Sequence, residues 1–216
     1  MGRELARIAA KDGRDVVLVA RRIERLEEFA RELTQDFGVA AHSVAADLDD
    51  TASPARVFRE VTAQSEVDFL VNAAGLGVHG FFNETPLEKE LESIRVNVSA
   101  LTELTKRFLP AMLERRRGVI LNVASTAAFQ PGPLMAVYYA TKAYVLSFTE
   151  ALAEELRGTG VTATALCPGP TVTEFQRRAG MEETPLFSGF LVSDAAAVAR
   201  AGYKGAMRGK RVVVPG

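Results

Sequence analysis

Short apolar runs alternate along the chain with longer segments in which apolar residues recur every three or four positions. The short runs predict buried strands at residues 16–20, 40–46, 67–72, 118–124, 161–167 and 210–214. The periodic segments predict helices at 1–8, about 26–37, 54–64, 86–116, 137–157 and 195–207. Pro110 is expected to kink or interrupt the longest helical tract. Alternating strands and helices predict an α/β fold, with a doubly wound parallel sheet in three α/β/α layers.

The 216 residues are enough for one domain with a sizeable core, and no repeat or linker divides them, so we expect residues 1–216 to form a single domain. The net charge of -1 offers no general attraction to nucleic acid or anionic lipid. One cysteine, Cys167, excludes an internal disulfide and fits a reducing compartment. Without a long apolar stretch or a signal-peptide core, the sequence predicts a cytoplasmic protein with no membrane span.

Three side chains outline a proton-transfer site. Tyr138 and Lys142 stand four residues apart, so they share one face of the predicted 137–157 helix. Ser125 follows a predicted strand, at the end of the sheet where ligands of open α/β folds bind. A neighbouring lysine cation would lower the tyrosine pKa from its usual value of about 10. Spacing alone leaves Tyr139 as an equal candidate, and an ordinary amphipathic helix also explains a Tyr and a Lys at this spacing.

Several motifs occur in a fixed order: Asn72-Ala73-Ala74-Gly75, then Ser125, then Tyr138-Tyr139-Ala140-Thr141-Lys142, then Pro168-Gly169. From Gly2 to about Val214 the chain resembles the short-chain dehydrogenase/reductase family. The resemblance implies a Rossmann-like fold and an NAD(P)-dependent oxidoreductase that transfers a hydride between nicotinamide and a carbonyl or secondary alcohol. It also makes Tyr138, the first tyrosine of the Y-x-x-x-K motif, the catalytic one.

The resemblance implies four catalytic residues. Tyr138 would exchange the proton and Ser125 would hydrogen-bond the substrate oxygen. Lys142 would lower the pKa of Tyr138 and bind the nicotinamide ribose. Asn97 would support a water relay, and hydrogen bonding at a helix kink is the alternative role for its side chain.

Arg21 and Arg22 follow the strand at 16–20, where an acidic residue would favour a free ribose 2′-hydroxyl. Arginines here can pair with a 2′-phosphate, so NADP is preferred and NAD stays possible; the alternative is that both lie at a solvated helix start. No metal site is expected. The resemblance assigns the remaining cofactor contacts to Gly2, Asp47, Leu48, Asn72, Ala73, Ala74, Gly75, Tyr138, Lys142, Pro168, Gly169, Thr171 and Thr173.

Family members usually open with a central strand and a T-G-x-x-x-G-x-G loop, of which only Gly2 matches here. We therefore expect an N-terminally truncated fold, either from a start assigned to an internal methionine or from a genuinely shortened product. The glycines of Gly75-Leu76-Gly77-Val78-His79-Gly80 fit G-x-G-x-x-G, but no helix is predicted directly after them, so we expect a loop. A non-catalytic binding or scaffolding module is the alternative function.

Apolar residues gather in segments expected near the pocket and favour a lipophilic ketone, aldehyde or alcohol as substrate, although core packing explains some of them equally well. They are Phe81, Phe82, Leu134, Met135, Phe175, Phe187, Phe190 and Leu191. The segment 168–192 is a candidate lid over the site. By resemblance only, a homodimer or homotetramer is expected to form through the two long helices, 86–116 and 137–157.

Overall fold

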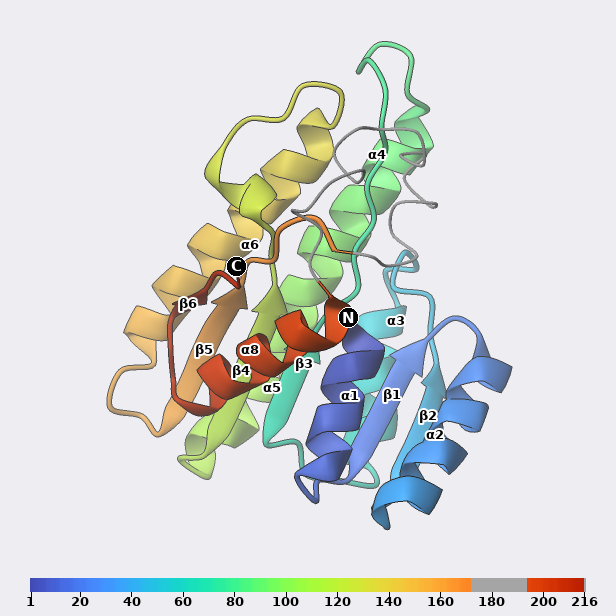
Figure 1. Cartoon of the computed structure of the whole chain (residues 1–216), viewed down its shortest axis with the longest axis vertical. Coiled ribbons are helices and arrows are strands. Elements are labelled where there is room, and N and C mark those ends of the chain that lie inside the picture. The colour runs from blue at the N-terminus through green and yellow to red at the C-terminus, as the bar shows by residue number, and fades with distance from the viewer. Residues whose placement is uncertain (172–193, 216) are drawn as a thin grey trace.

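The computed structural model describes residues 1–171 and 194–215 (Figure 1). Its strands in that part of the chain are β1 (Val16–Ala20), β2 (Ala41–Ala45), β3 (Phe69–Asn72), β4 (Gly118–Val123), β5 (Val161–Leu166) and β6 (Val212–Val213). Its α-helices there are α1 (Gly2–Lys11), α2 (Ile23–Phe37), α3 (Ser53–Thr62), α4 (Leu87–Ile94), α5 (Leu101–Glu114), α6 (Ala136–Glu155) and α8 (Ala195–Met207). The alternation predicted from the hydrophobic pattern is confirmed.

Every strand pairing among these elements is parallel, with β1 next to β2 and the order β3-β4-β5-β6 in a second group. The α/β doubly wound prediction is therefore correct in class. The two groups are not hydrogen-bonded to each other, and the division falls between β1 and β3. This is the middle of the sheet, where the resemblance places the family's first strand.

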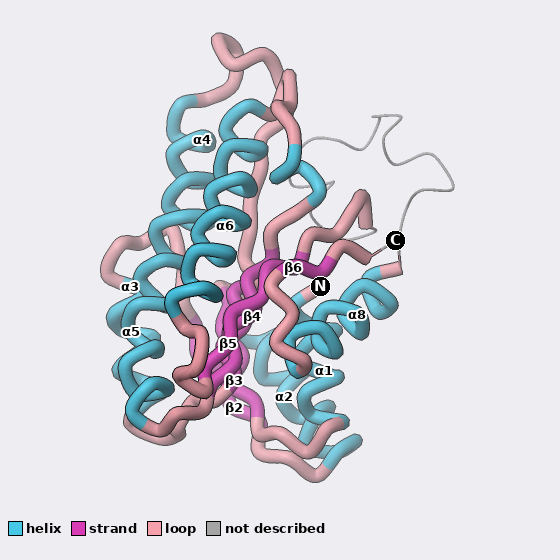
Figure 2. The backbone as a smooth tube through the Cα atoms, turned by 90° about the vertical axis from the view of Figure 1, so that its left-hand side faces the viewer, coloured by secondary structure: helices cyan, strands magenta, loops and turns pink. Residues whose placement is uncertain are grey.

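The helices form one layer on each face of the strands. Figure 2 shows α3, α5 and α6 on one side of the sheet and α1, α2 and α8 on the other. Helix α1 packs on both strand groups: Leu5 lies in a cluster with Leu121 of β4, and Ala10 lies in a cluster with Val16 and Leu18 of β1. On the other face, one cluster combines Val44 of β2 with Ile120 of β4 and Ala163 of β5, so apolar packing on both faces joins the two strand groups where hydrogen bonds do not.

The predicted helical tract at 86–116 is confirmed over residues 87–114, but its irregularity is not at Pro110. A π-helix, η1 (Arg95–Ala100), separates α4 from α5, while Pro110 lies inside α5, which continues to Glu114. The wider π turn occurs where Asn97 makes hydrogen bonds outside its own helix, a common setting for π segments near functional sites. Helix α8 is capped by Asp194, whose side chain accepts hydrogen bonds from the backbone N–H groups of Ala196 and Ala197 in the first turn.

Candidate active site

Ser125 lies directly beyond β4, where the chain leaves the sheet in an extended conformation and starts a short 3-10 helix, η2 (Thr126–Phe129). Its Oγ accepts a hydrogen bond from the Ala127 backbone N–H at 3.1 Å and donates one to the Pro168 carbonyl at 3.4 Å. These two contacts hold the hydroxyl at the carboxyl end of the parallel strands, as the sequence predicted.

Tyr138 lies in the first turn of α6 and forms a side-chain hydrogen bond with Ser125. Burial raises the pKa of the Tyr138 phenol to about 12, and the hydrogen bond with Ser125 opposes that change only in part. This direction is opposite to the lowering expected from Lys142. The phenol in this structure is therefore protonated at neutral pH.

Tyr139 takes a different position from Tyr138. Its ring covers Gly132, so closely that a Cβ added at Gly132 would come within 2.2 Å of a ring carbon. The two tyrosine rings meet edge to face at 6.0 Å between centroids. Spacing could not distinguish these residues, whereas the fold places Tyr138 at Ser125 and packs Tyr139 against the preceding loop.

Lys142 lies one helical turn beyond Tyr138 and is only 4% exposed. Its Nζ donates a hydrogen bond to the Val123 carbonyl at 2.8 Å and lies 5.8 Å from the centroid of the Tyr138 ring. Burial lowers the pKa of the Lys142 amine from 10.5 to about 8. A Cβ added at Gly75 would lie 3.3 Å from Nζ, so the loop after β3 passes directly over this ammonium group.

Asn97 lies in the π-helix and is 1% exposed. Its Oδ1 accepts from the Leu76 N–H at 2.8 Å, while its Nδ2 donates to the Leu76 carbonyl at 2.8 Å and to Thr141 Oγ1 at 3.0 Å. Both amide hydrogens of Asn97 are thus used by the protein itself. The kink hydrogen bonding named as the alternative role is present in the structure, and it ties the 73–80 loop to α6.

The residues expected at the cofactor lie along the carboxyl edge of the strands, with different immediate partners. Gly2 opens α1 next to Ala73, whose Cβ would be 3.5 Å from a Cβ at Gly2. Ala74 is exposed beside them. The buried Asn72 instead donates both amide hydrogens into the core, to Thr105 Oγ1 at 3.1 Å and to Asn122 Oδ1 at 2.9 Å. Its side chain supports the sheet and has no hydrogen left for a ligand.

Arg21 and Arg22 are exposed at the end of β1. Arg21 lies 3.8 Å from a carboxylate oxygen of Asp47 and 3.8 Å from one of Glu92. Part of its charge is therefore balanced within the protein. A phosphate at this position would share Arg21 with two acidic groups. Leu48, the neighbour of Asp47, packs against the core.

The loop after β5 completes the edge. The Pro168 carbonyl accepts from the Thr126 N–H at 2.9 Å, and Thr171 Oγ1 donates to the Gly169 carbonyl at 2.9 Å. Among residues 1–171 and 194–215, no heavy atom lies within 4 Å of a Cβ added at Gly169. Thr173 and the proposed lid from residue 172 onward lie outside the described residues, as do Phe175, Phe187, Phe190 and Leu191.

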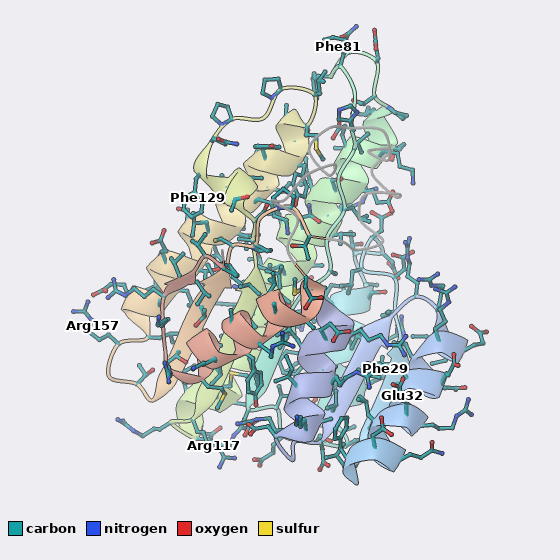
Figure 3. All side chains as sticks on the ribbon, in the orientation of Figure 1. Phe29, Glu32, Phe81, Arg117, Phe129 and Arg157 are labelled. Carbon is teal, nitrogen blue, oxygen red and sulfur yellow. The ribbon has the colours of Figure 1, made fainter. Side chains whose placement is uncertain are left out.

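Two of the apolar side chains expected near the pocket are strongly exposed, Phe81 at 63% and Phe82 at 68%. Figure 3 shows Phe81 at the tip of the loop that precedes α4. This loop contacts the one before α6, because the Gly80 N–H donates to the Leu134 carbonyl at 2.9 Å. Leu134 is also exposed, whereas Met135 is buried. The G-x-G-x-x-G segment forms a loop, as predicted, since α4 begins only at Leu87.

Sequence reasoning missed Thr141. This buried residue sits between Tyr138 and Lys142, accepts from Asn97 Nδ2 and donates to the Tyr138 carbonyl at 2.7 Å. The available signal was its position on the motif helix, where a polar side chain next to the lysine faces inward. Among residues 1–171 and 194–215, no cluster of three or more His, Cys, Asp or Glu side chains could hold a metal ion.

Comparison with known proteins agrees with this geometry. The model of the family described as short chain dehydrogenase matches residues 1–184, and the chain belongs to that family. The structure of a short-chain dehydrogenase from Sphingobium yanoikuyae in complex with NADPH superposes with a TM-score of 0.92 at 32% identity, covering 99% of this chain and 83% of that one. The bulky-bulky ketone specific alcohol dehydrogenase from Comamonas testosteroni superposes with a TM-score of 0.86 at 26% identity, covering 99% and 81%.

Curated relatives are similar over most of this chain. A very-long-chain 3-oxoacyl-CoA reductase of Anas platyrhynchos is 32% identical over 181 residues, which make up 82% of this chain and 58% of the relative. An uncharacterised oxidoreductase of Bacillus subtilis is 33% identical over 174 residues, or 81% and 65%. The chain thus spans less than two thirds of the length of these relatives. No helix in the described part of the chain is long and apolar enough to cross a membrane.

Proposed function

We propose that this chain is an NADP-dependent oxidoreductase that interconverts a carbonyl group and a secondary alcohol. The observation that carries the proposal is the convergence of Ser125, Tyr138 and Lys142 at the carboxyl end of β4. A phenol hydrogen-bonded to a serine hydroxyl, one turn from a buried amine, is suited to moving a proton to or from a substrate oxygen. A purely structural role would not require an ammonium group buried beside that phenol, because such burial is costly.

The residues around this point fit a bound nicotinamide nucleotide, which would supply or accept the hydride. Gly75 brings the backbone close to the Lys142 amine, and no other described part of the chain crowds Gly169. The Lys142 ammonium would hold the ribose next to the substrate. Ser125 would donate to or accept from the substrate oxygen and fix its position relative to Tyr138.

The raised pKa of Tyr138 bears on the direction of the proton transfer. With a pKa of about 12 the phenol holds its proton at neutral pH, and that is the form needed to protonate the oxygen of a carbonyl during reduction. Lys142, with a pKa of about 8, is mostly a cation below that pH and can stabilise the phenolate left behind. The two groups together can exchange a proton with the oxygen of a carbonyl compound or of the matching alcohol.

Two observations support NADP over NAD. Arg21 and Arg22 stand at the end of β1, where no acidic residue follows the strand. The similar structures from Sphingobium yanoikuyae and Thermococcus sibiricus contain NADPH and 5-hydroxy-NADP, respectively. Against this, Asp47 and Glu92 already flank Arg21. We therefore expect a preference for NADP and not strict exclusion of NAD.

The substrate we propose is lipophilic. Phe81, Phe82 and Leu134 expose apolar surface on adjoining loops near the start of α6. Similar proteins are named as reductases of very-long-chain 3-oxoacyl-CoA and as an alcohol dehydrogenase specific for bulky-bulky ketones. A bulky ketone with apolar groups on both sides is therefore the first substrate class to assay.

The test is Tyr138→Phe, with Tyr139→Phe as its matched control on the neighbouring residue. We expect Tyr138→Phe to lower the turnover of bulky ketones by about 100-fold or more, which is the usual contribution of a positioned general acid, while NADPH binding changes little. Tyr139→Phe should keep most of the activity, because Tyr139 packs on Gly132. Equal losses in the two variants would contradict the assignment of the proton to Tyr138. Tight NADPH binding by the unaltered chain without turnover of any carbonyl substrate would instead favour a binding module.

A further inference from the structure

Two buried threonines on α6 make nearly identical contacts. Thr141 Oγ1 accepts from the Asn97 amide at 3.0 Å and donates to the Tyr138 carbonyl at 2.7 Å. Thr149 Oγ1 accepts from the Asn122 amide at 2.9 Å and donates to the Val145 carbonyl at 2.6 Å. Thr141 is 3% exposed and Thr149 is 0% exposed, so burial does not separate them.

The two threonines differ in what lies at the far end of each chain of hydrogen bonds. From Thr149 the chain runs through Asn122 to Asn72 and Thr105, which are core side chains of β3 and α5. From Thr141 it runs through Asn97 to the backbone of Leu76. Leu76 directly follows Gly75, whose backbone passes over the Lys142 amine. Of these two series of hydrogen bonds, only the one that starts at Thr141 therefore leads to the candidate active site.

We propose that Thr141 is a positioning residue for the reaction assigned above, because it fixes the orientation of the Asn97 amide and the first turn of α6 at the same time. One hydrogen of the Asn97 amide is bound to Leu76 and the other to Thr141, so only one orientation of the amide satisfies all its partners. The other bond of Thr141 restrains the peptide that carries Tyr138. Thr141 itself transfers no proton.

Removal of the Thr141 hydroxyl should change the conformation of the loop at Gly75 and Leu76. A valine at 141 keeps the volume and the β-branched shape but accepts no hydrogen bond. One N–H of the almost fully buried Asn97 would then lack a partner, and an amide in that situation turns or shifts toward another acceptor. Any such movement alters the paired bonds with Leu76, and through Gly75 it alters the backbone above Lys142.

The experiment compares Thr141→Val with Thr149→Val, and uses Thr141→Ser to restore the hydroxyl. Two measurements are made on each protein without cofactor: thermal unfolding and the hydrogen exchange rate of the Leu76 amide. Both valine variants should lower the melting temperature, since each removes a buried hydroxyl with two partners. Only Thr141→Val should speed the exchange of the Leu76 amide, by about tenfold, the equivalent of one lost hydrogen bond. Thr141→Ser should return that rate to that of the unaltered protein.

Kinetic measurements follow with NADPH and a bulky ketone. Because Thr141 acts through geometry, Thr141→Val should lower kcat by roughly tenfold with little change in KM, and Thr149→Val should leave both nearly unchanged. Since the inference rests on the proposed function, the exchange measurement separates the two: it decides the role of Thr141 even in a protein that turns over no ketone. An unchanged Leu76 exchange rate in Thr141→Val, or the same acceleration in Thr149→Val, would overturn the inference. If Thr141→Val does not fold, Thr141→Ala provides the same exchange measurement.

Discussion

Lys142 has a proposed role in catalysis, but burying its charge lowers the stability of the folded protein. The variant Lys142→Met tests both effects. Methionine retains an unbranched apolar side chain of similar length but carries no charge. The lysine is 4% exposed and donates a hydrogen bond to the Val123 carbonyl. We expect Lys142→Met to abolish turnover and, at neutral pH, to raise the stability of the protein.

The size of this effect follows from the pKa. A pKa lowered from 10.5 to about 8 corresponds to roughly 3 kcal/mol lost by the folded state when the amine is charged. The variant leaves the Val123 carbonyl without its donor, which costs about 1–2 kcal/mol. The net gain is therefore about 1–2 kcal/mol near pH 7. For a chain of this size that is a rise in melting temperature of roughly 2–8 °C.

The stability difference between Lys142→Met and the unaltered protein should change sign as the pH rises. Between pH 8 and 10.5 the unfolded chain keeps the proton on Lys142 while the folded chain releases it, so the free energy of unfolding of the unaltered protein rises with pH across this window. The variant has no such group and gains nothing. Above about pH 10 the unaltered protein should thus become the more stable of the two, because its neutral amine still donates to Val123.

Urea unfolding of both proteins at pH 7, 8, 9 and 10 measures this difference directly, and groups that do not interact with Lys142 cancel in the comparison. Lys204→Met is the control, since Lys204 is exposed on α8 and its loss should cost less than about 1 kcal/mol at every pH. The reasoning fails if Lys142→Met is less stable than the unaltered protein at pH 7. It also fails if the difference between them stays constant from pH 7 to pH 10.

Two further predictions concern the divided sheet and the contact between α8 and the turn that follows α1. Some backbone amides of β1 and β3 point away from the strand with which each is paired, namely those of Val17, Val19, Phe69 and Val71. NMR should show these amides exchanging with deuterium about tenfold faster than the paired amides of Leu18 and Leu70. Equal protection along both strands would show that the facing edges of β1 and β3 are hydrogen-bonded. Tyr203→Phe removes a hydroxyl that donates to Asp12 at 2.6 Å and accepts from Arg14 at 3.1 Å. Urea unfolding should show a free energy of unfolding lower by about 1–2 kcal/mol. An unchanged free energy would mean that this contact between α8 and the turn after α1 adds nothing to stability.

The order and type of the elements were predictable because strands buried on both faces form short continuous apolar runs. The run at 118–124 and the observed β4 agree to within a residue, and so do the run at 161–167 and β5. The strand at 210–214 was predicted too long, since only Val212 and Val213 pair with β5.

Parts of the site could not be predicted from the sequence, because they depend on contacts between distant residues and on burial in the folded chain. The π-helix at 95–100 depends on Asn97 finding Leu76 and Thr141, partners that lie 21 and 44 residues away. The pKa of Tyr138 depends on how much water the folded chain excludes, and in this structure burial outweighs the hydrogen bond with Ser125. Spacing along a helix identifies which side chains can meet. It does not give the solvation that sets their charge.

The divided sheet also separates two parts of the proposed site. Ser125, Tyr138 and Lys142 are all held by β4, α6 and the loops beside them, which belong to the continuous group of four strands. Arg21 and Asp47, expected near the far end of the nucleotide, belong to the β1–β2 pair. Apolar packing across both faces, by α1 on one side and by α3 and α5 on the other, therefore sets the distance between proton transfer and phosphate recognition. Changes in α1 should accordingly weaken nucleotide binding before they disturb the geometry around Tyr138.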